Sequence, residues 1–223
     1  MWAAVVRPGP GTGVGVVPGY DGAVCETRLW ACPGAGQDLR MDYTVRAVRS
    51  EDWQQARQLR LLALQDPAAP VAFLETYEAA VRKPDGFWQE RTDQVAEGRS
   101  ARQFVAEGPD GSLAGTVSVL VERAADDAVR FGAPAEFDQT HVVGVFVRPQ
   151  DRGRGVADAL FREAVDWSWS LTDPQVERVR LYVHEANQRA AAFYRRIGFV
   201  PTGQTTPVPG DPSSREVEFE IRR

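Results

Sequence analysis

Glycine and arginine residues are concentrated in the loop "RPQDRGRG", which follows the apolar stretch "THVVGVFV" (140–147) and leads directly into an amphipathic segment. Gly153 and Gly155 allow a backbone to approach a ligand closely and to adopt positive φ. Arg152 and Arg154 offer charged donors suited to phosphate oxygens. When a strand enters a helix through such a loop, the first N–H groups of the helix are open to an anion. The pattern predicts a loop that binds a diphosphate.

Two familiar phosphate-binding loops do not fit this segment. A P-loop places Lys and then Ser or Thr after its last glycine, whereas this chain has Val156 and Ala157 there. A dinucleotide fingerprint requires a third glycine or alanine three residues after Gly155, where this chain has Asp158. The loop also lies in mid-chain, after a predicted hairpin. These differences disfavour a nucleotide-binding protein.

The elements around the loop are predicted from hydrophobic periodicity and from turn residues. Strands are expected over 43–48, 102–107, 113–122, 140–147, 178–184 and 215–222, and helices over 51–65, within 73–98, from 156 onward and over 188–197. Asn187 is expected to cap the last helix and Gly198 to end it. The order β-α-α-β-β-β-α-β-α-β predicts an α/β (α+β) fold, in which helices flank a mixed central sheet.

The first 40 residues differ from the rest of the chain. Residues 1–40 are dense in Pro and Gly and show no lasting period, so we expect a disordered, dispensable extension. They also lack the basic start and unbroken apolar stretch of a secretory signal. Met41 opens a regular pattern, and we therefore expect the folded domain to span residues 41–223.

Composition restricts the partners and the compartment. The formal net charge of −5 argues against nucleic acid or a membrane surface as a partner and suits a cationic or amine-bearing ligand. No apolar run reaches the roughly 20 residues that a membrane helix needs. Cys25 and Cys32 are the two cysteines, and without neighbouring histidines they predict no metal site. This cysteine usage favours the cytoplasm.

Two motifs occur in a characteristic order. Gln150, Gly153 and Gly155 match the pattern Q/R-x-x-G-x-G/A, between the expected strand and helix. Further on, "NQRAAAFYRRIGF" (187–199) matches N-x-x-A-x-x-F-Y-x-x-x-G-F. With both motifs, the chain resembles the GNAT superfamily of acyl-CoA-dependent N-acyltransferases over roughly residues 43–221.

The resemblance implies an N-acetyltransferase that uses acetyl-CoA as co-substrate and lets a primary amine attack the thioester directly, without a covalent enzyme intermediate. The backbone of Val145, Phe146 and Val147 would pair with the pantetheine arm, between strands that splay apart. Asn187 would contact the same arm, and Tyr194 would protonate the leaving thiolate. The diphosphate would be bound by the N–H groups of Arg152, Gly153, Arg154, Gly155, Val156 and Ala157.

Several alternatives stay open at this stage. Tyr194 also falls on an apolar helix face, where it could be a core aromatic. The general base is not defined by a motif, and the candidates are Glu122, Asp138, His141 or a water molecule. The motifs report binding more directly than turnover, so a non-catalytic acyl-CoA-binding sensor or partner module is the alternative function.

The acceptor is not identified by any motif. It is expected to be a small-molecule or peptide amine, bound mainly by the helices within 51–98 and by the loop at 124–138. Trp167 and Trp169 are two residues apart on one helix and cannot share a face. One of them could therefore contribute to a homodimer contact.

Overall fold

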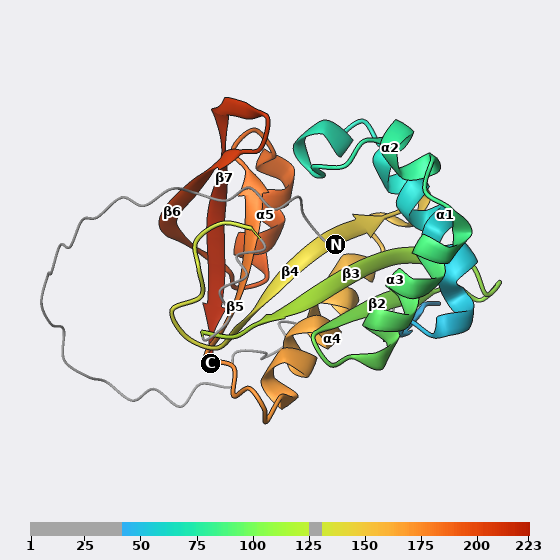
Figure 1. The fold of residues 1–223 in the computed structure, drawn as a ribbon, viewed down its shortest axis with the longest axis horizontal. Coiled ribbons are helices and arrows are strands. Elements are labelled where there is room, and N and C mark those ends of the chain that lie inside the picture. The colour runs from blue at the N-terminus through green and yellow to red at the C-terminus, as the bar shows by residue number, and fades with distance from the viewer. Residues whose placement is uncertain (1–41, 125–130) are drawn as a thin grey trace, which may run out of the picture.

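The computed structural model describes residues 42–124 and 131–223 of the chain. The expected extension over 1–40 and both cysteines lie outside the described residues. Within them, one sheet has the strand order β1-β2-β3-β4-β5-β7-β6 (Figure 1). The strands are β1 (Thr44–Ala47), β2 (Ala101–Glu107), β3 (Leu113–Glu122), β4 (Gln139–Val147), β5 (Arg178–His184), β6 (Val200–Val208) and β7 (Asp211–Arg222).

The α-helices connect and cover these strands. They are α1 (Trp53–Leu64), α2 (Tyr77–Val81), α3 (Asp85–Glu97), α4 (Val156–Ser170) and α5 (Gln188–Arg196). The β4–β5 pair is parallel and the other neighbouring strands are antiparallel, with α4 on the connection from β4 to β5. The mixed sheet with flanking helices confirms the predicted fold class.

The strand β6 was not predicted. Its sequence "VPTGQTTPV" contains Pro201, Gly203 and Pro207, which argue against a strand in most positions. β6 pairs with β7 at the edge of the sheet, however, and an edge strand tolerates proline because one of its sides needs no N–H donors. The expected final strand over 215–222 is the second half of the longer β7.

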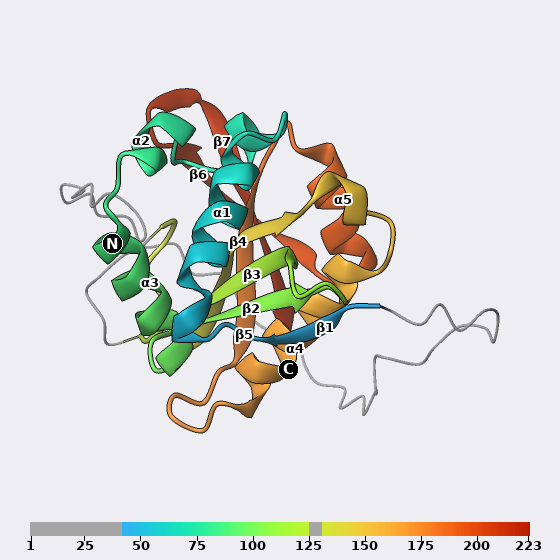
Figure 2. The same cartoon turned by 90° about the vertical axis from the view of Figure 1, so that its right-hand side faces the viewer.

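Helices cover both faces of the sheet, with α4 on one face and α1 and α3 on the other (Figure 2). β3 runs between these layers and is buried along its whole length. Its side chains alternate between the two cores, so Val117 and Val119 pack with Leu160 of α4, whereas Leu120 packs with Leu59 of α1. The sheet is therefore held rigidly at the centre, where β4 must be positioned.

Candidate active site

The strands β4 and β5 separate in the middle of the sheet. They pair from Gln139–Arg178 through Val142–Leu181, and then both continue unpaired with each other, to Val147 and to His184 (Figure 1). A cavity of about 860 Å³ opens at this fork. The volume is typical of small-molecule sites. The predicted splaying of these strands is thus present in the structure.

A bulge interrupts β4 where this strand borders the cavity. Gly144 has a φ of 64°, and the register against β3 shifts between Thr116 and Ser118 at this point. A glycine in the left-handed region and an extra residue on one strand are the marks of a β-bulge. The bulge re-aims Val145, Phe146 and Val147, all of which line the cavity. Gly144 within an apolar strand was the sequence signal for it.

The glycine loop ends at the uncapped N-terminus of α4. Gly155 is the N-cap residue with a φ of 77°, and no side chain accepts a hydrogen bond from the first turn. Gly153 also has a φ of 77°, and a Cβ atom there would meet no atom within 4 Å. Both glycines line the cavity together with Val156 and Ala157. The open N–H groups and the helix dipole make this wall suited to an anion.

The side chain of Arg152 braces the loop. Its Nε donates to the Val147 carbonyl at 3.0 Å, and its Nη2 donates to the Asp66 carboxylate after α1. Arg152 lines the cavity, but these two acceptors fix its guanidinium. Its side chain therefore connects the end of β4 to the segment that follows α1.

Arg154 lies on the outer side of the loop. It is exposed and absent from the cavity lining, and its Nη1 donates to the Tyr43 hydroxyl at 3.2 Å. The same hydroxyl donates to the buried Asp151 carboxylate at 2.6 Å. The structure thus brings the backbone of the predicted loop to the cavity, but not the Arg154 side chain.

The second motif brings two side chains to the cavity. Asn187 caps α5, as predicted, because its Oδ1 accepts a hydrogen bond from the Ala190 N–H at 3.1 Å. Tyr194 lies among Phe161 and Phe219, with 8% of its surface exposed, and lines the cavity. Burial, and then the nearby charge of Glu216, raise the pKa of the Tyr194 hydroxyl. Its ring is part of the core, and it also reaches the site.

Glu216 is a cavity residue that the sequence did not identify. It lies on β7 opposite His184 of β5, and burial raises the pKa of its carboxyl from 4.5 to about 7. The segment "REVEFEIR" (215–222) alternates apolar residues with glutamates, which predicts a strand but gives the glutamates no function. The alternation could not show that the face carrying Glu216 borders a cavity.

Glu122, one of the three candidate bases, lies in a buried network beneath the fork of β4 and β5. It accepts hydrogen bonds from Gln139 at 2.7 Å and Arg180 at 2.8 Å, and lies 3.1 Å from Nδ1 of His141. Burial alone would raise the pKa of Glu122, but the His141 contact and the charges of His141 and Arg180 lower it to about 2. Glu122 is therefore an anion that orients its neighbours.

The other two candidates differ in their relation to the cavity. Asp138 accepts a hydrogen bond from the Ala124 N–H at 3.0 Å and is not among the residues that line the cavity. His141 lines the cavity, although only 2% of its surface is exposed. Of the expected loop at 124–138, residues 125–130 lie outside the described residues, and Phe131 borders the cavity.

Metal centres and membrane spans are both absent from residues 42–124 and 131–223. No group of three or more His, Cys, Asp or Glu side chains in these ranges is arranged to hold a metal ion. None of the helices there combines the length and the apolar character that a membrane span requires.

Comparison with known proteins agrees with this geometry. The chain matches the model of the acetyltransferase (GNAT) family over residues 45–199 and belongs to this family. This confirms the resemblance seen in the two motifs and the prediction of an acyltransferase. Comparison with curated proteins gives no match.

Solved structures share the fold at low identity. An acetyltransferase of the GNAT family from Streptococcus pneumoniae has a TM-score of 0.62 and 16% identity, over 81% of this chain and 99% of that chain. The spermidine N-acetyltransferase from Vibrio cholerae, in complex with CoA and spermine, has a TM-score of 0.58 and 18% identity, over 81% of this chain and 95% of that chain. NAA60 from Arabidopsis thaliana, in complex with a bisubstrate analogue, has a TM-score of 0.56 and 19% identity, over 81% of this chain and 97% of that chain.

Proposed function

We propose that the protein transfers an acetyl group from acetyl-CoA to a primary amine by direct attack. One observation carries this proposal: the uncapped N-terminus of α4, the bulged backbone of β4 and the Tyr194–Glu216 pair all face the same cavity. A thioester with a diphosphate tail requires an anion site and an edge of free backbone groups. Its reaction with an amine requires a pair of titratable side chains.

Acetyl-CoA would lie along the fork between β4 and β5. Its diphosphate binds the N–H groups that begin at Gly153, where a residue without a side chain leaves room for it. Its pantetheine arm pairs with the backbone of 145–147, which has no β5 partner in the described sheet. Asn187 borders the same cavity and contacts the arm. The Vibrio cholerae structure that shares this fold contains CoA, which supports the assignment.

The reaction needs no covalent enzyme intermediate. The neutral amine attacks the thioester carbonyl carbon, so the C–N bond forms as the C–S bond breaks and its electron pair moves to sulfur. Glu216 takes the proton that the amine loses, and Tyr194 gives a proton to the thiolate. Glu216 then returns its proton to Tyr194, which leaves both side chains as they began. An acid and a base held in one cavity make this exchange efficient.

Glu216 is the better placed of the two cavity bases. It lies opposite His184, beyond the last pair of β4 and β5, where these two strands have separated. His141 pairs with Arg180 inside the paired segment, and its Nδ1 lies 3.1 Å from Glu122. A base with a pKa of about 7 suits proton transfer near neutral pH.

The test is a screen of primary amines with detection of free CoA thiol. We expect amine-dependent thiol release and a product heavier by one acetyl group in mass spectrometry. Tight acetyl-CoA binding without turnover of any amine would instead establish the alternative, a non-catalytic acyl-CoA-binding module. The acceptor class (a small-molecule or peptide amine), the cytoplasmic location and a homodimer stay proposals that rest on the sequence.

A further inference from the structure

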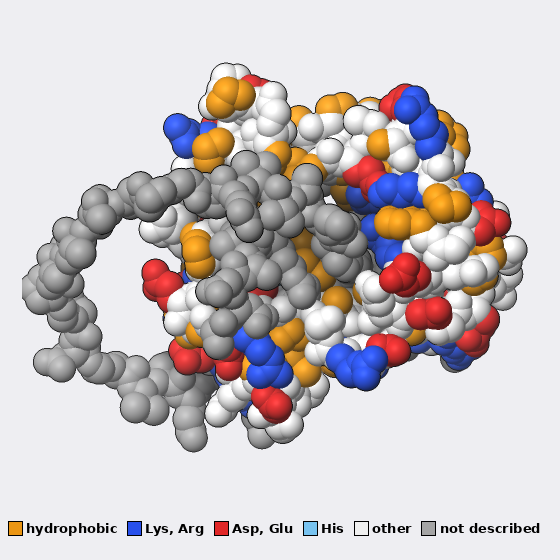
Figure 3. All heavy atoms as spheres, in the orientation of Figure 1, with side chains coloured by type: hydrophobic (Ala, Val, Ile, Leu, Met, Phe, Trp, Pro, Cys, Tyr) orange, Lys and Arg blue, Asp and Glu red, His pale blue; other side chains and the backbone are white. Residues whose placement is uncertain are grey.

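The side of the cavity built by α1, α2 and α3 carries a cluster of charged residues. Arg60 lies on α1, Glu75 precedes α2, Lys83 precedes α3, and Arg91 lies on α3. All four line the cavity, and we call them the cationic wall. Figure 3 shows Lys and Arg side chains, in blue, on the part of this face where Figure 1 places α1–α3.

Two cations of the wall share one carboxylate. Nε and Nη2 of Arg60 donate to one oxygen of Glu75 at 3.1 and 3.0 Å, and Nζ of Lys83 donates to the other oxygen. Arg60 and Glu75 expose less than a fifth of their side chains, at 18% and 17%. The contacts place one more positive charge than negative charge in a half-buried position, where electrostatic interactions are strong.

Arg91 adds a third positive charge to the same wall. Its side chain is close enough to Arg60 for the two charges to oppose each other. Burial, and then the charge of Arg60, lower the pKa of Arg91 to about 10, so the group stays protonated at neutral pH. Because Arg60 and Lys83 share the single carboxylate of Glu75, the anionic group of a ligand would be attracted to this wall.

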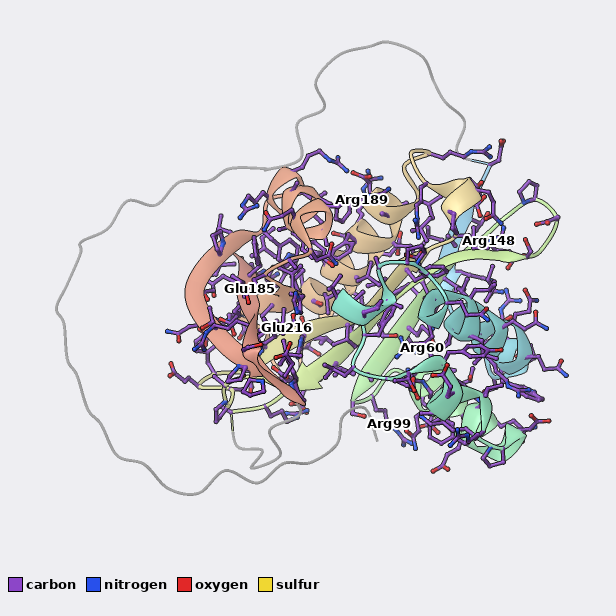
Figure 4. All side chains as sticks on the ribbon, turned by 90° about the horizontal axis from the view of Figure 1, so that it is seen from above. Arg60, Arg99, Arg148, Glu185, Arg189 and Glu216 are labelled. Carbon is purple, nitrogen blue, oxygen red and sulfur yellow. The ribbon has the colours of Figure 1, made fainter. Side chains whose placement is uncertain are left out.

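The opposite side of the cavity includes a carboxylate, that of Glu216, as well as Arg189 and Arg196. Glu216 reaches the cavity from β7, and Figure 4 shows it and Arg60 on opposite sides of the site, on elements far apart in the sequence. A ligand that spans the cavity would therefore place its amine near Glu216 and meet positive charge at its other end.

We propose that the cationic wall binds a negatively charged group of the acceptor, so that the substrate is an amine that also carries a carboxylate or a phosphate. This inference rests on the proposed acetyl transfer. It differs from what the net charge of −5 suggested, because that charge favoured a cationic ligand. It also separates this chain from the Vibrio cholerae enzyme, whose structure holds spermine.

The first experiment compares matched amines with the wild-type protein. β-Alanine is set against its amide, O-phosphoethanolamine against ethanolamine, and amino acids against their amides, with spermidine as the cationic reference. We expect the anionic member of a pair to have a kcat/KM at least about tenfold higher, the scale of one charge-assisted hydrogen bond. The two pairs of small amines show which anion is preferred. A preference for neutral amines or for spermidine overturns the inference and leaves acetyl transfer intact.

The second experiment changes the charge of the wall in both directions. Lys83→Gln should raise KM for the anionic amine about tenfold, whereas Glu75→Gln should lower it. If Glu75 instead recognised a cationic amine, Glu75→Gln would raise the KM for that amine. The control is Arg99→Gln, because Arg99 is exposed and pairs with Glu97 outside the cavity lining (Figure 4). Melting temperatures show that each variant is folded.

Two further outcomes separate this inference from the proposed function. Loss of acetyl-CoA affinity in Lys83→Gln would assign the wall to a CoA phosphate and overturn the inference. If no amine is acetylated, the proposed function fails, and calorimetry with CoA-bound protein then tests the wall alone. Anionic amines that do not bind in that titration overturn the inference too.

Discussion

The two sides of the cavity are built in different ways. On one side, which we call the strand wall, the cavity is lined by β4, the glycine loop, α4, α5 and β7, and this side includes the open helix N-terminus, Tyr194 and Glu216. On the other side, the cationic wall presents charged side chains from α1, α3 and their connections. Backbone groups are fixed by the fold itself, whereas the charges of the cationic wall depend on contacts between distant segments, such as Arg60 with Glu75.

This difference suggests that the two walls have different roles. The strand wall offers the groups that any acyl-CoA reaction needs, and changes there should affect every acceptor alike. The cationic wall offers no group that such a reaction needs, and changes there should alter KM according to the charge of the acceptor. Substitutions on the strand wall test this difference between the two sides.

Glu216→Gln should have the largest effect. If Glu216 is the base, kcat/KM at pH 8 should fall about 10³-fold for every acceptor, within the range of one acid–base group. Because the pKa of Glu216 is about 7, the wild-type activity should rise with pH through 7, and the variant should lack that rise. Rates measured from pH 5.5 to 9 give both profiles. A rise through pH 7 that persists in Glu216→Gln and vanishes in His141→Gln would make His141 the base.

The same substitution should change the pH dependence of stability. The folded state holds the Glu216 proton up to about pH 7, whereas an unfolded carboxyl loses it near 4.5. The tighter proton binding stabilises the folded state fully below pH 4.5, and this stabilisation declines as the pH rises to 7. At pH 8 the buried carboxylate is charged, so Glu216→Gln should be more stable than the wild type there, but not at pH 4. Urea unfolding at the two pH values measures the difference. Equal differences would show that the carboxyl has an ordinary pKa.

Tyr194→Phe should lower kcat about 100-fold with little change in KM, because the lost interaction forms mainly in the transition state. The ring and its contacts with Phe161 and Phe219 remain, so the stability loss should stay near 1 kcal/mol. The matched control is Tyr77→Phe on α2, away from the cavity lining. Full kcat in Tyr194→Phe would reduce this residue to a core aromatic.

Gly153→Val should raise the Kd for acetyl-CoA about tenfold, since a side chain would displace the diphosphate from the helix terminus. Gly111→Val is the matched control: Gly111 has a φ of 74° against 77° for Gly153, and neither site has an atom within 4 Å of a new Cβ. Both variants should lose about 1–2 kcal/mol of stability through backbone strain. Calorimetry that finds the same Kd for both would make the loop a simple connection.

Removal of residues 1–40 should have the smallest effect. The described strands, helices and cavity lining come from Thr44 onward. We therefore expect an unchanged melting temperature and an unchanged Kd for acetyl-CoA in a protein that begins at Met41. A clear loss in either measurement would assign a packing or binding role to the extension, and the domain would then not be limited to residues 41–223.

Local patterns predicted the glycine loop and the elements on either side of it, but not Glu216. The apolar strand, the glycine loop and the helix after it are contiguous in sequence, and the cap formed by Asn187 lies three residues from the N–H that it binds. Short-range geometry determines such features, so a sequence reveals them directly. The strand β6 was missed, because only its place at the edge of the sheet makes Pro201 and Pro207 acceptable there.

The sequence by itself determined the fold class, the loop at the start of α4 and the family. Tertiary structure alone decided which charged residues face the cavity. Glu75 meets Lys83 eight residues away and Arg60 fifteen residues away, and Glu216 reaches Tyr194 from another element. The physical reason is that burial and electrostatic pairing depend on distances in space. The alternating glutamates of β7 look the same in sequence whether they face water, an arginine or a substrate.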